Sequence, residues 1–144
     1  ITGDTLVRFE YDHNYNLITS ISYSNTGELN FREDNKYDDN KNLIVKDRND
    51  KINAANSCKI VFSYDIDKSK IGERAYAASG YLRFSKKYEY DANKNIISES
   101  MLSGQGSLLW KRKRKYSYDS KGNWLQCMLE YNSGSYLILR SIRY

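Results

Sequence analysis

Hydrophobic and polar residues alternate along most of this chain with a period of two. The clearest case is the segment 82–90, where one face carries Leu82, Phe84, Lys86, Tyr88 and Tyr90 and the residues between them are polar. The same parity recurs around 7–11, 29–37, 60–64, 108–118 and 136–144. Period two with one polar face is typical of an antiparallel sheet that packs on one side. The pattern therefore predicts β-strands, and no segment shows a helical period.

A Tyr-Asp pair recurs along the chain at an almost constant interval. The five copies are Tyr11-Asp12, Tyr37-Asp38, Tyr64-Asp65, Tyr90-Asp91 and Tyr118-Asp119, spaced by 26, 27, 26 and 28 residues. In four copies a glycine follows the Asp by 15 residues, at Gly27, Gly80, Gly106 and Gly134. The second copy has no such glycine, and we expect its turn near 49–50 or 54–56. Each repeat therefore holds two strands and two turns.

Short turns require each strand to pair with the next one in an antiparallel manner, because a parallel crossover needs about a dozen residues. We therefore predict an all-β fold: one hairpin-repeat domain, residues 1–144, forming an antiparallel meander of about ten or eleven strands. So many strands favour a coiled or curved sheet. The strands that follow the Tyr-Asp turns have a less regular parity, and we expect β-bulges in some copies. The last segment, 136–144, is expected to be an edge strand.

Composition narrows the possible functions only slightly. The chain has 14 tyrosines and no proline, and its formal charge of +5 is far from that of a dedicated nucleic-acid binder. No apolar run approaches the roughly 18–20 residues that a membrane helix needs. Cys58 and Cys127 stand at different offsets from their Tyr-Asp pairs and are separated by two or more repeats, so we expect them to remain unbridged.

The element Tyr-x-Tyr-Asp at 88–91 and 116–119, with the turn Asp119-Ser120-Lys121-Gly122-Asn123, resembles the YD repeats of Rhs and teneurin proteins. The resemblance covers nearly the whole chain, although Tyr15, Lys41, Lys94 and either Lys68 or Ser69 replace the turn glycine in the other copies. It implies β-hairpins of the kind that spiral into a shell around a passenger in those larger proteins. Five repeats are too few to enclose a passenger, and a chain without proline cannot carry the family's proline-containing cleavage motif.

The composition is also similar to that of short Tyr- and Asn-rich exported proteins from Bacteroides-type bacteria. Both resemblances imply an extracytoplasmic location, which is periplasmic, cell-surface or secreted, with any signal peptide lying outside this sequence.

Three Asp-x-Asn-x-Asn strings begin at Asp12, Asp38 and Asp91. Alternating oxygen ligands at this spacing also open a calcium-binding EF-hand loop, which further needs Gly at position six and Glu at position twelve. Neither residue is present here. We therefore expect these residues to fix turns by bonding to their own backbone, and we predict no metal site and no cofactor.

Residues suited to catalysis are sparse. The chain has one histidine, His13, which lies in a turn, and its carboxylates are spread about one per repeat. Zinc-type Cys-His clusters, phosphate-binding glycine loops and nucleophile elbows are missing from the sequence. We predict that the protein is not an enzyme.

One strand carries a concentrated positive charge. Five consecutive cations stand between two aromatic residues in the run Trp110, Lys111, Arg112, Lys113, Arg114, Lys115 and Tyr116. A functional interpretation is a polyanion site that also stacks on the rings. A structural interpretation sends the three lysines to solvent, places the two arginines beside aromatic rings and lets a cationic strand discourage aggregation.

The sequence thus favours a non-catalytic extracytoplasmic module for structure or recognition, with a polysaccharide or protein surface as ligand. The alternative is a polyanion- or carbohydrate-binding protein that uses strand 110–116. A homodimer through the C-terminal edge strand is the partner that the pattern suggests. Membrane insertion and nucleic-acid binding are not expected.

Overall fold

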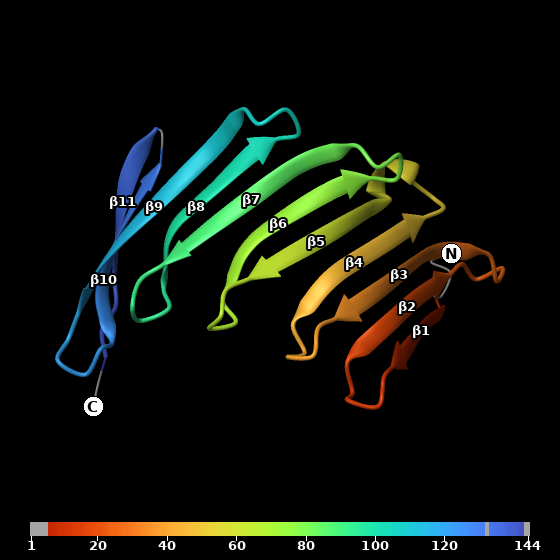
Figure 1. Ribbon diagram of the computed structural model, residues 1–144, viewed down its shortest axis with the longest axis horizontal. Coiled ribbons are helices and arrows are strands. Elements are labelled where there is room, and N and C mark those ends of the chain that lie inside the picture. Colours follow the sequence, from red (N-terminus) through yellow and green to blue (C-terminus); the bar gives the residue numbers. More distant parts are fainter. Residues whose placement is uncertain (1–5, 132, 143–144) are drawn as a thin grey trace. The chain divides into compact units, whose positions relative to one another are not determined.

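The computed structural model describes residues 6–131 and 133–142. They form strands β1 (Leu6–Tyr11), β2 (Leu17–Tyr23), β3 (Leu29–Tyr37), β4 (Leu43–Asp50), β5 (Cys58–Tyr64), β6 (Lys70–Ala77), β7 (Leu82–Tyr90), β8 (Ile96–Ser103), β9 (Leu108–Tyr118), β10 (Trp124–Tyr131) and β11 (Gly134–Leu139), shown in Figure 1. A single 3₁₀ turn, η1 (Ala54–Asn56), lies between β4 and β5. Strand order in the sheet follows chain order. The predicted all-β antiparallel meander is confirmed.

The chain forms two compact units, which we describe separately. Unit 1 comprises Ile1–Ser63 with Glu73–Arg83, and unit 2 comprises Tyr64–Gly72 with Phe84–Tyr144. Unit 1 therefore contains β1 to β4 and most of β5 and β6, whereas unit 2 contains most of β7 and all of β8 to β11. The expectation of one domain stays a prediction.

The Tyr-Asp pair marks the end of every second strand. Strands β1, β3, β5, β7 and β9 end at the tyrosines of the five pairs, as the repeat predicts. The Asp then opens a turn: the Asp91 carbonyl accepts the N–H of Lys94 at 3.0 Å, and the Asp91 N–H donates to the carbonyl of Asn95 at 3.0 Å. Lys94 has a φ of 62°. This geometry is a three-residue hairpin loop, a type I turn followed by one left-handed residue.

The same left-handed position is occupied in each of the other Tyr-Asp turns, by Tyr15, Lys41, Lys68 and Gly122. The choice left open in the third repeat is thereby settled: Lys68, not Ser69, takes the place of the glycine. A non-glycine residue in this conformation costs roughly 1–2 kcal/mol, so four of the five turns need compensating contacts.

The aspartate carboxylate provides those contacts. In the first turn, Asp12 Oδ1 accepts the N–H groups of Asn14 (2.8 Å) and Asn16 (2.9 Å), and Oδ2 accepts the Asn16 side-chain amide (2.9 Å). Corresponding bonds join Asp38 to Asn42 and Asp119 to Asn123. The Asp-x-Asn-x-Asn strings therefore hold their own turns, as the turn interpretation predicted. Among the residues that the structure describes, no three His, Cys, Asp or Glu side chains are grouped to hold a metal ion.

In three repeats a tyrosine hydroxyl bonds to the repeat before it. Each bond ends on a carbonyl 20 residues earlier: Tyr37 to Leu17 (3.1 Å), Tyr90 to Lys70 (2.8 Å) and Tyr116 to Ile96 (3.4 Å). Asn35 stands where other repeats have an aromatic residue, and its side-chain amide donates to the same Leu17 carbonyl at 3.0 Å. These bonds span 20 residues and are therefore shorter than the repeat of 26–28 residues.

A β-bulge lies beside the Tyr-Asp turn in each strand pair whose register is described there. One residue of the returning strand is left without a partner: Ile18, Ile44, Ile97 and Leu125. An extra residue reverses the parity of the strand that follows. The predicted bulges are confirmed, but they lie at the same place in all four pairs and so do not explain why residues 17–23 and 125–131 alternate differently.

The second repeat replaces its glycine turn with a longer loop that carries η1. Asp50 is buried, and its Oδ1 accepts the N–H groups of Ile52 (3.1 Å) and Asn53 (2.9 Å). The Arg83 guanidinium donates to the carbonyls of Ala55 (2.9 Å) and Ser57 (3.3 Å). The loop lies where the sequence placed a turn, and it is fixed from both sides.

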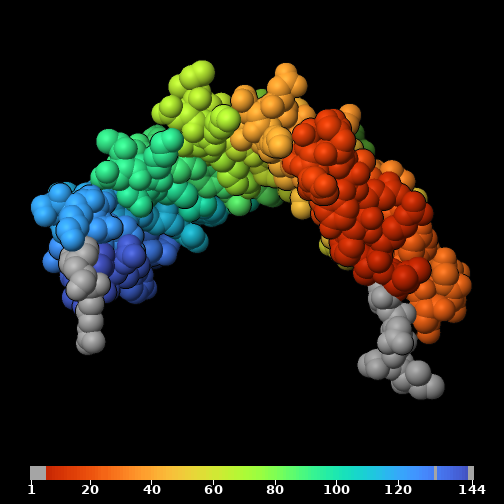
Figure 2. Space-filling model, turned by 90° about the horizontal axis from the view of Figure 1, so that it is seen from below, coloured from red at the N-terminus to blue at the C-terminus, as the bar shows by residue number. Residues whose placement is uncertain are grey.

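Each unit is a single layer of strands, so burial is shallow. Among the described residues no large side chain is less than 2% exposed, and buried serines such as Ser20 and Ser22 lie between larger neighbours. The side chains of β1 are open to solvent, with Leu6 66% exposed and Phe9 53% exposed (red in Figure 2). The expectation of a sheet packed on one side therefore needs correction, because within each unit the described residues form one layer of strands only.

Two further predictions concern the cysteines and the last strand. Cys58 and Cys127 are both free thiols, as expected. The expected strand 136–144 is shorter than predicted: β11 ends at Leu139, residues 140–142 are irregular, and residues 143–144 lie outside the described part of the chain.

Candidate functional site

Strand β9 divides the predicted cationic run between the two faces of the sheet. Its register places Arg112 opposite Glu99 and Tyr131, whereas Lys113 lies opposite Ser98 and Glu130. Because side chains alternate along a strand, Trp110, Arg112, Arg114 and Tyr116 form one surface, the arginine face. Lys111, Lys113 and Lys115 form the other, the lysine face. One ligand on one face cannot contact all five cations.

Arg112 is the centre of the arginine face. Its guanidinium carbon lies 4.7 Å from the centre of the Trp110 ring and 5.3 Å from that of Tyr131. A cation over an aromatic face contributes about 0.5–1 kcal/mol at an exposed site. Two rings from neighbouring strands therefore position a guanidinium whose side chain remains 40% exposed.

Glu99 is the acidic partner on this face, and two arginines share it. Its Oε2 lies 3.9 Å from Arg112 Nη1 and 3.7 Å from Arg114 Nη2. The Nη1 of Arg114 is buried and has no hydrogen-bond partner. Leaving a buried donor unpaired costs about 1–3 kcal/mol. The arginine face thus combines one excess positive charge with a donor that lacks an acceptor.

Tyr116 packs within the arginine face and is not available to a ligand. Its ring centre lies 6.1 Å from those of Tyr118 and Trp124, and its hydroxyl donates to the Ile96 carbonyl. Burial, together with the neighbouring Cys127, raises the pKa of the Tyr116 hydroxyl to about 12. Of the seven residues in the predicted run, this one serves mainly the scaffold.

The lysine face forms a shallow groove of about 430 Å³. Its polar lining comes from four adjacent strands of unit 2, with Glu89, Ser98, Lys113 and Glu130 in one cross-strand row. Lys111 and Lys115 lie on either side of Lys113 along β9. Arg114 also lines the groove, so four cationic residues oppose two carboxylates and the lining carries a formal excess of two positive charges.

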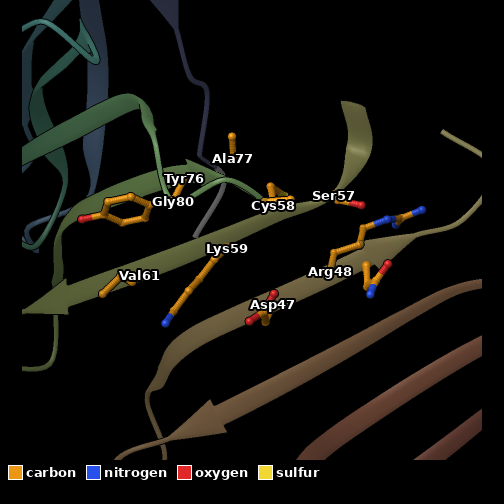
Figure 3. Close-up of a pocket in the computed structure, with 11 residues that line it drawn as sticks. Asp47, Arg48, Ser57, Cys58, Lys59, Val61, Tyr76, Ala77 and Gly80 are labelled. Atoms are coloured by element: carbon orange, nitrogen blue, oxygen red, sulfur yellow. The ribbon is translucent and has the colours of Figure 1, made fainter. Parts of the chain in front are cut away.

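Sequence reasoning did not identify a second depression, which lies in unit 1 and has a volume of about 580 Å³ (Figure 3). It lies beside the loop of the second repeat. Asp47 and Asn49 of β4, Lys59 and Val61 of β5 and Tyr76 of β6 contribute to its lining. The one signal in the sequence was the missing glycine of that repeat, which marked where the pattern changes but not which side chains converge there.

Comparisons with known proteins support the fold. No protein-family model matches the sequence, and the comparison with curated proteins found no relative. The chain is similar to part of a solved structure of the toxin complex TcdB2–TccC3, with a TM-score of 0.51 and 16% sequence identity over 92% of this chain. It also matches a Tc holotoxin pore from Photorhabdus luminescens, with a TM-score of 0.42 and 14% identity over 91% of this chain. In both cases the chain spans 9% of the matched chain's length. The likeness to TcdB2–TccC3 supports a β-hairpin fold of the YD-repeat kind.

Proposed function

We propose that this chain is a non-catalytic module for structure or recognition that acts outside the cytoplasm and binds through the surface of its sheet. The observation that carries the proposal is the arginine face, where aromatic rings and guanidinium groups are displayed on a single-layer sheet. Aromatic and arginine side chains are enriched where proteins recognise partners. The extracytoplasmic location is supported by the fold's likeness to part of a toxin complex.

The use of the carboxylates supports a non-catalytic role. The repeated aspartates bind their own turns, so they are engaged by the fold. In the lysine-face groove, Glu89 and Glu130 are separated by three strand spacings, which is about 14 Å between backbones. A carboxylate pair that hydrolyses glycosides works at about 5–9.5 Å. Their backbones are farther apart than this, so both side chains would have to lean toward each other to form such a pair.

An anionic ligand, such as a polyanion or an acidic carbohydrate, is the second candidate function. It is favoured by the single carboxylate of Glu99 shared between Arg112 and Arg114, which leaves one excess positive charge beside the exposed side chain of Arg112. A carboxylate or sulfate group on the ligand would accept from the Arg112 guanidinium, whose side chain is 40% exposed, while sugar rings would stack on Trp110 or Tyr131.

Affinity chromatography at physiological salt separates the two functions. The protein is passed over immobilised heparin and over an immobilised neutral glycan, together with Arg112→Gln/Arg114→Gln and the charge-matched control Lys113→Gln/Lys115→Gln. Heparin retention that only the arginine variant loses would establish the anionic ligand. Equal loss in both variants would indicate general electrostatic attraction. No retention of the wild type would leave a protein surface or a structural role as the function.

The proposed partner also includes a second copy of this chain, paired through β11. Every described residue of β11 is exposed, and the strand carries no charged side chain. Its pairing with β10 directs the backbone groups of Ser135, Leu137 and Leu139 away from β10, because inward and outward groups alternate along an antiparallel strand. A two-fold axis at Leu137 would place Leu137 opposite its own copy and Ser135 opposite Leu139. Each of these pairs can then form backbone hydrogen bonds.

A cysteine at the axis tests this arrangement. In the background Cys58→Ser/Cys127→Ser, Leu137→Cys should form a disulfide-linked dimer under mild oxidation, because directly opposed residues lie within bridging distance. The control Lys113→Cys should remain monomeric. Failure of Leu137→Cys to cross-link at high protein concentration would refute the β11 dimer.

A further inference from the structure

We propose that the depression in unit 1 is a binding site for a neutral saccharide. It is distinct from the arginine face, since all of its lining residues belong to unit 1. Its volume of about 580 Å³ lies within the range of about 300–1,000 Å³ that small-molecule sites occupy. The proposal does not depend on the function proposed above.

The depression lies where the chain departs from its own repeat. Four repeats turn at a glycine, whereas the second uses a loop that Asp50, Asn53 and Arg83 hold in place. Asp50 and Asn53 accept N–H groups within the loop, and Arg83 of β7 donates to two carbonyls of this segment, so the loop is held in one conformation. Local departures from a consistent pattern concentrate at functional sites.

The polar side chains that converge on the depression have no partners among themselves. Asp47 and Lys59 are direct cross-strand partners on β4 and β5, yet their side chains form no ion pair in the described structure, and Asn49 makes no side-chain hydrogen bond there. Arg48 also lines the depression, but its guanidinium is engaged elsewhere, 4.1 Å from the Phe31 ring and 3.0 Å from Asp50. The site thus offers the Asp47 carboxylate as an acceptor, the Lys59 ammonium as a donor and the Asn49 amide, which can donate and accept.

This set of groups selects the chemistry of the ligand. Asp47 would repel a simple anion and Lys59 would repel a simple cation, so the depression has no preferred sign of charge. Sugar hydroxyls donate and accept at once, which matches a carboxylate, an ammonium and an amide placed side by side. A hydrogen bond to a charged group is stronger than one between neutral groups.

Apolar surface completes the site. Val61 and the Tyr76 ring lie on the strands next to the polar groups, with Tyr76 on β6 and Asp47 on β4 (Figure 3). From β4 to β6 there are two strand spacings, about 9.6 Å, which accommodates one or two sugar rings. The ring of Tyr76 can cover the C–H face of a sugar while its hydroxyl remains available for hydrogen bonding.

Nuclear magnetic resonance titration of the isotope-labelled full chain tests the proposal. The probes are lactose, cellobiose and maltotriose, each raised to about 50 mM, a range suited to an open and shallow site (Kd of millimolar order corresponds to about −4 kcal/mol). At least one probe should shift backbone resonances within 47–49, 57–61 and 76–80 and leave those of 110–116 unchanged. No shift with any probe, or shifts centred on 110–116, would overturn the proposal.

Variants assign the effect to named groups. Asp47→Ala and Tyr76→Ala should each weaken the binding of the responding sugar by tenfold or more, whereas the control Asp39→Ala, an exposed aspartate of the same unit, should bind like the wild type. Asp47→Asn and Tyr76→Phe serve as milder substitutions should an alanine variant fold poorly, as judged from its spectrum. Unchanged binding in all four pocket variants would also overturn the proposal. A heparin disaccharide in the same titration reports on the arginine face independently, so the two sites can fail separately.

Discussion

Replacing Asp91 with alanine removes the anchor of one Tyr-Asp turn and measures how much the motif stabilises the sheet. Asp91 Oδ1 accepts the N–H groups of Asn93 (3.0 Å) and Asn95 (2.9 Å), and Oδ2 accepts the hydroxyl of Tyr118 in the next repeat. Three bonds at about 0.5–1.5 kcal/mol each set the scale. Because water can replace part of the contacts to the exposed N–H groups, we expect a loss of about 2 kcal/mol.

Urea denaturation followed by circular dichroism measures this loss, and thermal melting should show a decrease in Tm of about 6 °C, since 1 kcal/mol shifts the Tm of a chain of this size by about 3 °C. The control is Asp67→Ala, which changes an exposed aspartate in the equivalent turn of the preceding repeat. We expect that control to stay within about 0.5 kcal/mol of the wild type. Equal effects of the two substitutions, or no effect of Asp91→Ala, would refute the assigned role of the motif.

The pH dependence of the same measurement is a second check. Desolvation acts to raise the pKa of Asp91, but the hydrogen bonds from Tyr118, Asn95 and Asn93 outweigh it, and the pKa lies below its usual value. A carboxylate with a depressed pKa stabilises the fold above its unfolded pKa of about 3.9, and this contribution is lost as the pH falls through the folded pKa. The stability difference between wild type and Asp91→Ala should therefore be full at pH 7 and should narrow below pH 4.

Three further predictions follow from single features. Replacing Lys111, Lys113 and Lys115 together with serine should leave the circular dichroism spectrum unchanged and cost at most about 0.5 kcal/mol per site, since these side chains lie on the lysine face; an unfolded variant would contradict the assigned parity. Tyr116 has a pKa of about 12, so it should be among the last tyrosines to ionise in an ultraviolet titration, and Tyr116→Phe should remove that late component. Because the pKa of the Tyr116 hydroxyl is raised in the folded state, the hydroxyl stabilises the fold below about pH 10. This stabilisation is lost as the pH rises toward 12. Gly106→Ala should destabilise the fold by about 1 kcal/mol in urea denaturation. Gly106 has a φ of 87°, and an added Cβ would meet no neighbouring atom, so the effect reports the backbone alone: the cost of a left-handed alanine exceeds the gain from a less flexible unfolded chain. An unchanged denaturation midpoint would show that the turn rearranges.

Much of the fold was predictable because its signals are local. The Tyr-Asp spacing fixed the ends of the odd strands, and the parity around Tyr88 and Tyr90 fixed which residues share a face. The third turn was ambiguous because the left-handed conformation is a property of the backbone, and neither Lys68 nor Ser69 has a side chain that indicates it. The end of β11 was misjudged because alternation continues through Ile142 although strand pairing ends at Leu139.

The candidate sites were harder to predict, since they depend on which strands bring side chains together. Parity separated the arginines of β9 from its lysines, but nothing in the run itself indicated that Glu99 and Tyr131 flank Arg112. The depression in unit 1 was missed entirely because Asp47, Lys59 and Tyr76 each look like ordinary strand residues. Asp47 and Lys59 are brought together by the register between β4 and β5, and the register across an irregular loop cannot be deduced from periodicity.

The tyrosine bonds that reach back 20 residues also bear on how fast the chain folds. Each strand with a described register pairs with its immediate neighbour in sequence, and each hydroxyl link closes a loop shorter than one repeat. Sheets usually fold slowly because segments far apart in sequence lose conformational entropy before they form stabilising contacts. Loops of about 20 residues close at a modest entropic cost. Within each unit, any hairpin can nucleate and its neighbours can add to it one at a time, as in other repeat arrays. We therefore expect refolding on the millisecond scale typical of mixed α/β domains, faster than that of sandwiches and barrels of similar stability.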